Sequence, residues 1–161
     1  MDTSIKILLA KSDDSAFNPR EGWLVRGMKG YRVLTGIDAS YDEAKEICQI
    51  LFSYHFGHSY SLLSLVSINS TEEQRLVYSL VLASKHSHDQ FWIGARDDEV
   101  HGLRWIDGQD VKWTNFVQYK KQSPGQRCVA IDATKKGRVE NPGKWVFDHC
   151  ASRKGLICQR A

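Results

Sequence analysis

Two stretches of the sequence have the apolar spacing of amphipathic helices. The first follows the capping box Ser40-Tyr41-Asp42-Glu43, in which the serine accepts a backbone N–H and the glutamate reaches back to the cap. Its apolar positions predict a helix over residues 41–52 with Cys48 on the buried face. A second helix is predicted to start within residues 69–73, where two glutamates favour a helix N-terminus, and to end near Ser84.

The apolar runs outside these helices are short and are typical of strands. Residues 23–34 combine β-formers with glycines and predict a hairpin or paired strands, whereas residues 53–61 predict a loop. No helix is predicted after Ser84, and the other predicted strands are residues 62–68, 91–95, 103–108 with a closing Asp-Gly turn, 128–131, 144–147 and 155–159. Helices in the first half and strands in the second half indicate an α+β fold.

The composition favours one soluble domain. A chain of 161 residues with 42% hydrophobic residues can bury one substantial core, and 25% charged residues with only 3 prolines argue against long disordered tracts. The apolar run Ile5–Ala10 is interrupted by Lys6 and is too short to span a bilayer or to serve as a signal peptide. We therefore expect the chain as given to be soluble, with the targeting segment of a secreted protein lying outside it.

The four cysteines constrain the fold. Cys128, Cys150 and Cys158 lie in the C-terminal part of the chain, while Cys48 lies in the first predicted helix. Four cysteines allow three pairings, and counting selects none of them. Disulfides are the favoured interpretation, and buried free thiols are the alternative. A zinc site is disfavoured because no Cys-x-x-Cys pair occurs.

Several of these residues together resemble the C-type lectin-like domain over residues 22–159. The resemblance rests on Trp92-Ile93-Gly94-Ala95, on Trp105-x-Asp107-Gly108, and on a first cysteine in an opening helix. It also rests on Trp145, five positions before Cys150, and on a final cysteine eight positions later.

The resemblance implies a C-type lectin-like fold, with two helices flanking small antiparallel sheets, a long loop region and two disulfides. The family's pairing implies Cys48 with Cys158 and Cys128 with Cys150, and such bridges require an oxidising compartment. Residues 1–21 are then an N-terminal extension or linker, and residues 22–161 form the domain.

Members of this family that bind sugars through calcium use Glu-Pro-Asn or Gln-Pro-Asp in the long loop, an acidic residue before the third cysteine, and Trp-Asn-Asp in the last hairpin. Ca²⁺ takes about six to eight oxygen ligands. Here residues 119–124 read Tyr-Lys-Lys-Gln-Ser-Pro, Arg127 precedes the third cysteine, and the hairpin reads Trp145-Val146-Phe147. We therefore expect no metal there and interpret the last three residues as strand residues kept for packing. The acidic run Asp97-Asp98-Glu99 is a solvated turn or, alternatively, a second, structural calcium site.

The charge distribution favours an anionic partner. Residues 111–161 carry 11 Lys and Arg against 3 Asp and Glu, so this part is +8 and the remainder is −5. We predict a non-enzymatic, extracellular recognition module without cofactor, part of a larger secreted or membrane-anchored protein, that binds a protein or an anionic glycan, sulfated for example, without calcium. The predicted ligand-binding residues are Trp113, Tyr119, Lys120, Lys121, Gln122, Arg127, Lys135, Lys136 and Arg138.

Other functions stay open beside this one. The domain is alternatively a calcium-dependent lectin with an atypical site, or a structural module marked by an exposed apolar patch around Tyr54, Phe56 and Tyr60. A metal or enzyme site has histidine pairs at plausible separations but no third ligand fixed by spacing; its candidates are His55, His58, His86, His88 and His101. Nucleic acid is not expected as a partner, because no helix is rich in Arg or Lys.

Two local features have two interpretations each. Trp92, Trp105 and Trp145 lie in apolar strands and are predicted to be core, whereas Trp113 precedes the long loop and suits either packing or ligand stacking. The triplet Asn69-Ser70-Thr71 is a glycosylation sequon and also a helix cap.

Overall fold

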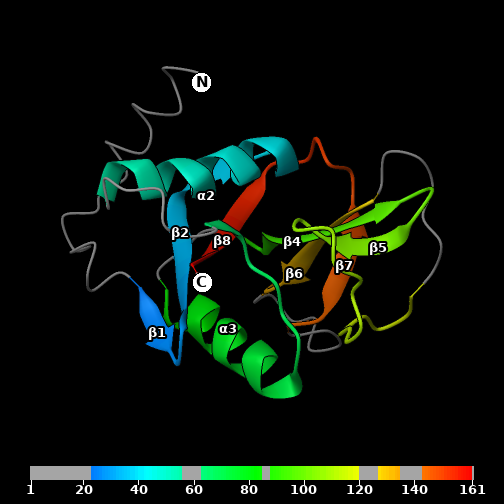
Figure 1. Cartoon of the computed structure of the whole chain (residues 1–161), viewed down its shortest axis with the longest axis horizontal. Coiled ribbons are helices and arrows are strands. Elements are labelled where there is room, and N and C mark those ends of the chain that lie inside the picture. The colour runs from blue at the N-terminus through cyan, green and yellow to red at the C-terminus, as the bar shows by residue number, and fades with distance from the viewer. Residues whose placement is uncertain (1–22, 56–62, 85–87, 120–126, 135–142, 161) are drawn as a thin grey trace.

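The computed structural model describes residues 23–55, 63–84, 88–119, 127–134 and 143–160, and of residues 51–55 it describes the backbone alone. Figure 1 shows the arrangement of the elements. The helices are α2 (Tyr41–His55) and α3 (Thr71–Ala83). The strands are β1 (Leu24–Arg26), β2 (Lys29–Ala39), β3 (Ser64–Leu65), β4 (Gln90–Asp98), β5 (Gly102–Trp105), β6 (Cys128–Asp132), β7 (Trp145–Asp148) and β8 (Lys154–Arg160).

The described strands form one mixed sheet. Its order is β1-β2-β8-β4-β6-β7, with β3 added on β8 and β5 on β4. All pairs are antiparallel except β4 with β8, where Phe91 faces Gly155 and Trp92 faces Leu156. The α+β prediction is confirmed. Because β8 joins β2 to β4 in the centre, the last described strand holds the N-terminal strand pair to the rest of the sheet.

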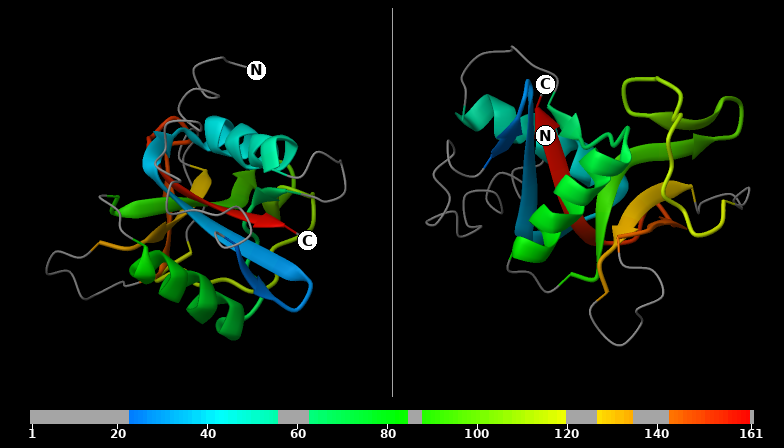
Figure 2. Two further views of the ribbon diagram at one scale, coloured as in Figure 1. Left: turned by 90° about the vertical axis from the view of Figure 1, so that its left-hand side faces the viewer. Right: turned by 90° about the horizontal axis from the view of Figure 1, so that it is seen from below.

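The two helices cover opposite faces of this sheet, as Figures 1 and 2 show. Neighbouring residues of the central strands point to opposite sides, so Trp92 and Leu156 pack toward α2 while Phe91 and Ile157 pack toward α3. Both faces are apolar because both are covered. This explains why the central strands are continuous apolar runs in the sequence rather than alternating ones.

Both predicted helix starts are confirmed by capping hydrogen bonds. The Glu43 N–H donates to Ser40 Oγ at 3.3 Å, and the Glu73 N–H donates to Ser70 Oγ at 3.1 Å. The predicted end of the first helix was wrong, because α2 continues to His55 through residues assigned to a loop. Nothing in residues 53–55 breaks a helix, and the next glycine in the sequence is Gly57.

Gly94 explains part of the Trp-Ile-Gly-Ala motif. Its N–H donates to the Val66 carbonyl at 2.8 Å, so the segment around β3 lies directly against β4. A Cβ at position 94 would lie 2.8 Å from the Leu65 carbonyl oxygen. Backbone atoms cannot move aside as a flexible side chain can, so the close approach of the two segments requires glycine.

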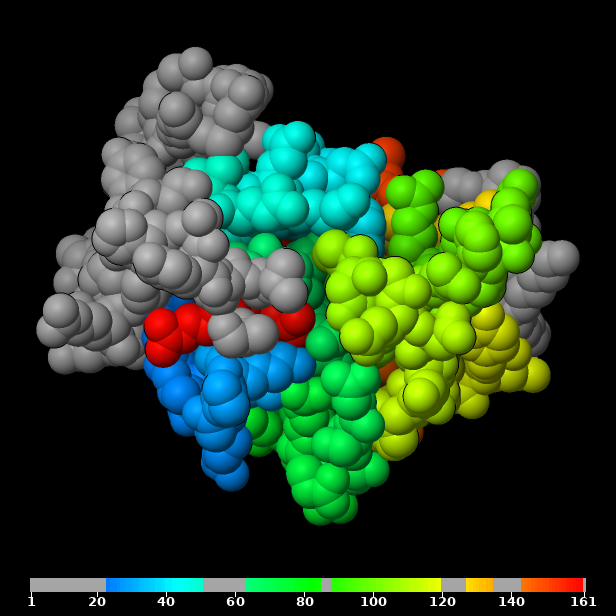
Figure 3. Space-filling view, viewed as in Figure 1, coloured from blue at the N-terminus to red at the C-terminus, as the bar shows by residue number. Residues whose placement is uncertain are grey.

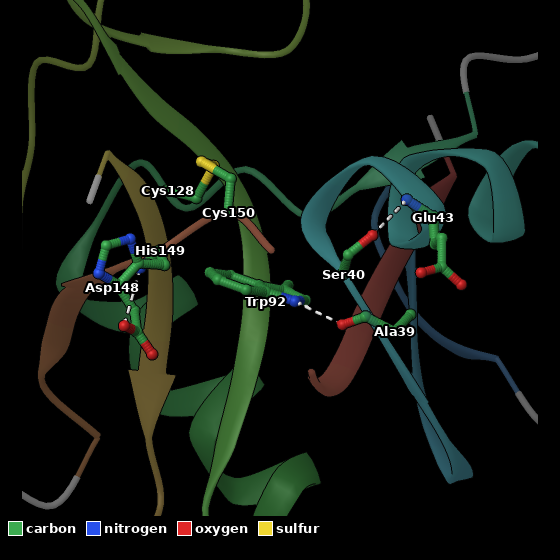
Figure 4. Close-up of a disulfide and its surroundings, with 8 residues drawn as sticks. All are labelled: Ala39, Ser40, Glu43, Trp92, Cys128, Asp148, His149 and Cys150. Carbon is green, nitrogen blue, oxygen red and sulfur yellow. Dashed lines mark hydrogen bonds between the residues drawn. A yellow bond between two sulfur atoms is a disulfide. The ribbon is translucent and has the colours of Figure 1, made fainter. Parts of the chain in front are cut away.

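Two disulfides cross-link the domain, one between a helix and the sheet and one within the strand-rich half. Cys48 of α2 is bonded to Cys158 of β8, and Cys128 of β6 to Cys150, which follows β7. These are the pairings that the family resemblance implies. The second bridge lies beside the indole of Trp92 (Figure 4), whose Nε1–H donates to the Ala39 carbonyl at 2.8 Å.

An ion pair between a buried lysine and a partly exposed aspartate fixes the end of β7 to the start of β8. Lys154 Nζ lies 2.6 Å from Asp148 Oδ2 and 5.1 Å from the centre of the Trp92 ring. Burial disfavours the Asp148 carboxylate, but hydrogen bonds from Lys154 and from the His149 N–H outweigh it and lower the pKa of Asp148. Lys154 is therefore a buried cation with its charge neutralised.

Candidate ligand-binding surface

Aromatic side chains gather where the segment after β5 meets β7. The ring of Phe116 stacks on that of Phe147, with ring centres 4.7 Å apart and planes 13° apart. The Tyr119 ring meets both edge-on, with its centre 5.4 Å from that of Phe116 and 5.7 Å from that of Phe147. We call Phe116, Val117, Tyr119 and Phe147 the aromatic patch.

The aromatic patch is open to solvent on one side. The side chains of Val117 and Tyr119 are 61% and 50% exposed, and the two phenylalanines are half-buried. Burial and the nearby carboxylate of Asp97 raise the pKa of the Tyr119 hydroxyl, so this side chain is neutral at physiological pH. Partly exposed rings held in one orientation suit either a pocket in a protein or a stacked sugar.

Trp145 positions the patch from below. Its ring is buried and lies edge-on to Phe116 at 5.4 Å and to Trp105 at 5.7 Å. The Trp145 Nε1–H donates to Gln74 Oε1 of α3, and the amide of Gln74 donates in turn to the Gly143 carbonyl. The Trp145 backbone N–H donates to Asn115 at 3.1 Å, which sets the position of the next residue, Phe116. The patch is thereby fixed to α3 and the sheet.

The core predictions for the tryptophans are confirmed. Trp92, Trp105 and Trp145 are all buried. Trp113 is half-buried, with its ring 5.7 Å from that of Trp145 at an angle of 81°. Trp113 therefore packs against the core with one side and keeps the other side accessible.

Arg127 is engaged within the molecule. Its guanidinium forms a short ion pair with the Glu99 carboxylate, and its carbonyl accepts the Asp97 N–H at 2.8 Å. The Arg127 side chain is 16% exposed, whereas that of Glu99 is 63% exposed. At the position before Cys128, the protein thus has a cation neutralised by its own carboxylate.

In the acidic run at the β4–β5 turn, Glu99 pairs with Arg127 and Asp98 makes local contacts. Asp98 accepts the Val100 N–H at 2.7 Å and lies 3.3 Å from His101, and these contacts lower the pKa of its carboxyl. Within the described parts of the chain, no three His, Cys, Asp or Glu residues are grouped so that they could hold a metal ion.

The described histidines of the metal or enzyme hypothesis lie in separate contacts. His88 packs edge-on against Phe91, and His101 contacts Asp98. The side chain of His55, and His58 and His86, lie outside the described residues. The same holds for the apolar patch of the structural-module hypothesis, since Phe56, Tyr60 and the Tyr54 side chain are not described.

Of the predicted ligand-binding residues, the structure describes Trp113, Tyr119 and Arg127. The other six lie outside the described residues: Lys120, Lys121, Gln122, Lys135, Lys136 and Arg138. Sequence reasoning did not select Phe116 and Val117, and it assigned Phe147 to packing alone. A usable signal was present, because Trp113, Phe116 and Tyr119 recur every third residue.

The family model for the lectin C-type domain matches residues 37–160 of this chain. The chain belongs to the C-type lectin domain family. The match includes both disulfides, the aromatic patch and the Trp-Ile-Gly-Ala motif, so the recognition made from the sequence is confirmed.

Related proteins and structures agree with this family. The chain is 27% identical over 113 residues to the secretory phospholipase A2 receptor of Bos taurus, a match that covers 67% of this chain and 7% of the receptor. It is 27% identical over 184 residues to layilin of Mus musculus, covering 96% of this chain and 46% of layilin. The chain thus spans less than half the length of these curated relatives.

The fold is also that of solved C-type lectins. The lectin CEL-I from Cucumaria echinata superimposes with a TM-score of 0.70 at 22% identity, covering 87% of this chain and 95% of that one. Among the described residues, no helix is both long and apolar enough to cross a membrane. C-type lectin domains are binding modules.

Proposed function

We propose that this C-type lectin domain binds a protein ligand outside cells, without calcium, through the aromatic patch. The observation that carries the proposal is the stack of Phe116 on Phe147. It places the ring of Phe147 at a position of the last hairpin where calcium-binding members of the family have an oxygen ligand, and packs the ring of Phe116, just before the long loop, against it. A phenyl ring offers a cation no lone pair, whereas it offers an apolar ligand a rigid contact surface.

The paired Arg127 supports calcium independence. An acidic residue before the third cysteine would contribute a charged oxygen ligand, but Arg127 has a positive charge and already holds the nearest carboxylate, that of Glu99. A dication placed there would be repelled by the guanidinium or would have to break this ion pair. The alternative of a calcium-dependent lectin with an atypical site finds no such support among these residues.

The exposed apolar side chains of the patch and the net charge of the C-terminal part together indicate the class of ligand. Val117 and Tyr119 present apolar area, and residues 111–161 carry a net charge of +8. A protein surface with an apolar side chain surrounded by acidic ones fits both properties, because the apolar contact supplies affinity and the charges guide the encounter. A sulfated glycan is the second candidate, favoured by the exposed Tyr119 ring beside a basic segment.

The two disulfides support an extracellular location, because such bridges persist only in oxidising compartments. We infer that residues 22–161 form the binding domain and that residues 1–21 link it to the rest of a larger secreted or membrane-anchored protein.

Binding in the presence of a calcium chelator tests the proposal. The chain is screened against acidic extracellular proteins and against sulfated and neutral glycans, with chelator or with added calcium, at low and high salt. We expect one class of ligand to bind equally well with and without calcium, and more weakly as salt rises. Binding that disappears with chelator and returns with calcium would contradict the proposal.

Matched surface variants then locate the contact. Tyr119→Ala removes an exposed ring of the patch, and Met28→Ala removes a 94% exposed apolar side chain from the β1–β2 turn. We expect the first change to weaken binding by about tenfold or more and the second to have no effect. Equal effects of the two would place the contact elsewhere.

A further inference from the structure

One motif of the sequence plays no part in the proposed ligand contact. The chain has four asparagines, and only Asn69 begins an Asn-x-Ser/Thr triplet, Asn69-Ser70-Thr71. Such a triplet is the acceptor for N-linked glycans in secreted proteins, and it requires the asparagine amide to be accessible. The same three residues begin α3, so the structure decides whether a helix cap and a glycan acceptor are compatible here.

The helix cap uses none of the groups that glycosylation needs. The hydroxyl of Ser70, the middle residue, accepts the Glu73 N–H at 3.1 Å. The Glu73 carboxylate accepts the backbone N–H of Asn69 at 2.7 Å and a hydrogen bond from Lys29 Nζ at 2.9 Å. The cap therefore engages the Ser70 side chain and the Asn69 backbone, and Glu73 is held by β2.

The two groups of the acceptor are free. Asn69 and Thr71 are both exposed, and neither side chain forms a hydrogen bond to another described residue. A buried or hydrogen-bonded amide would have to break its contacts to receive a glycan, whereas the Asn69 side chain is exposed. The helix cap and the glycan acceptor are thus separate functions of adjacent residues.

We propose that Asn69 is an N-glycosylation site and that the first sugars of its glycan lie against Trp113. The proposal rests on the extracellular location inferred above, because the reaction takes place in the secretory pathway. The Asn69 amide nitrogen forms a bond to the anomeric carbon of a lipid-diphosphate-linked oligosaccharide. The bond from that carbon to phosphate breaks, the lipid diphosphate leaves, and a base takes the amide proton.

A surface hollow beside Asn69 is the reason for placing the first sugars against Trp113. The hollow has a volume of about 450 Å³ and is lined by Asn69, Arg104, Asp110, Lys112 and Trp113, among others. In Figure 3 the segment after β5, in yellow-green, lies next to the green surface of α3, on the same face of the molecule. Trp113 rests on Trp145 with one side and is accessible on the other, which suits stacking against a sugar ring.

The proposed glycan contact gives Trp113 a role beside packing, which is to stack against the protein's own sugar. A glycan attached at the edge of the hollow is present at high effective concentration, and a free ligand would have to displace it. The ligand contact is then confined to the aromatic patch, while Trp113 holds the protein's own carbohydrate.

Expression of the full chain in secreting eukaryotic cells tests the attachment. We expect one glycan, removed by an amidase that cleaves glycan from asparagine and leaves aspartate at position 69, as mass spectrometry of the peptide shows. Asn69→Gln and Thr71→Val should abolish the glycan, whereas Thr71→Ser should retain it because serine is also accepted at that position. Ser70→Ala should also retain it, although it removes the cap.

A secreted protein with both disulfides formed but an unmodified Asn69 would overturn the proposal. Disulfide mapping on the same sample separates this outcome from failure of the proposed function, since secretion and oxidation would then be shown while the glycan is absent. Ligand binding in chelator is measured on that sample too.

Thermal unfolding tests the contact with Trp113. Trimming the glycan should lower the Tm of the wild-type protein by about 2 °C, and the same trimming should leave the Tm of Trp113→Ala unchanged. An equal shift in both proteins, or no shift in the wild type, would show that the sugars do not rest on this ring.

Discussion

The centre of the sheet and the aromatic patch are built by different means. At the centre, strands β2, β8 and β4 pair directly, both faces are covered by helices, and a disulfide joins α2 to β8. At the patch, the segment of residues 110–119 makes only isolated bridges, and stacked rings hold it to β7. Backbone pairing and burial stabilise the first region, and contacts between a few side chains stabilise the second.

This difference suggests that the sheet centre supports the fold and that the aromatic patch determines which ligand binds. A substitution at the sheet centre disturbs the packing of both helices. A substitution in the aromatic patch changes the surface and leaves Trp145, which supports the patch, in place. In calcium-binding members of the family the long loop and last hairpin meet around an ion. Here Phe116, just before the long loop, stacks on Phe147 of the last hairpin, so an apolar contact takes this place.

The largest expected effect is the loss of the disulfide at the sheet centre. Cys48 and Cys158 are 110 positions apart, and Cys128 and Cys150 are 22 apart. On the chain-entropy model, replacing the first pair by alanine lowers the free energy of unfolding by about 5 kcal/mol, and replacing the second pair lowers it by about 3 kcal/mol. Urea unfolding of the two double variants measures both values. A larger loss from the second pair would show that closure of the C-terminal hairpin, and not the link between α2 and β8, limits stability.

A carboxylate in the patch has the next largest effect. Phe147→Asp places a charge in a half-buried apolar stack, and we expect it to destabilise the protein by about 2 kcal/mol. It should not create calcium binding, because Val146 and Arg127 still provide no oxygen ligand from their side chains. Phe147→Leu is the control for size and should lower stability by about 1 kcal/mol. Stabilisation of Phe147→Asp by added calcium would mean that one acidic residue suffices to restore a metal site.

The same two regions differ in how far the sequence predicts them. The capping serines Ser40 and Ser70 and the helical spacing behind them are local signals, and both helix starts were predicted from them. The parallel pairing of β4 with β8 was not predicted, because strand patterns show which residues are buried but not which strands are neighbours.

Residues of the candidate site were predicted only where the type of a single residue suggested ligand binding. Tyr119 was selected as a ring that can stack on a sugar or fill a protein pocket, and Arg127 as a cation of the basic C-terminal part. The stack of Phe116 on Phe147 joins residues 31 positions apart, and no local pattern indicates such a contact. The ion pair of Arg127 with Glu99 is equally non-local, so the sequence suggested a free cation where the structure has a neutralised one.

A pH-dependent effect is expected at the boundary of the two regions. The pKa of Asp148 is lowered, so its ionised form stabilises the fold above the pKa of an unfolded aspartate, about 3.9, and this contribution is lost as the pH falls through the folded value. Asp148→Asn should therefore lower stability by about 1 kcal/mol at pH 7, a modest value because a third of the carboxylate is exposed.

At pH values below the folded pKa of Asp148, the wild type and Asp148→Asn should unfold alike, since neither then has a charge opposite Lys154. Urea titrations across the acid range test this convergence. A difference that persists unchanged at low pH would assign the effect of the substitution to packing and not to charge.

The smallest effect on stability, and the sharpest test of the patch, is expected from Glu99→Gln. Glu99 is 63% exposed, so removal of its charge should change the free energy of unfolding by less than about 0.5 kcal/mol. The change leaves Arg127 without its partner near Asp97, whose carboxylate acts on Tyr119. An acidic ligand seated on the aromatic patch should then bind a few times more tightly at low salt, with the gain lost at high salt. Arg127→Gln in the same assay should show no such gain. If Glu99→Gln binds no more tightly than the wild type, the cation next to Cys128 serves only to hold the β4–β5 turn, and the ligand's charge is recognised elsewhere.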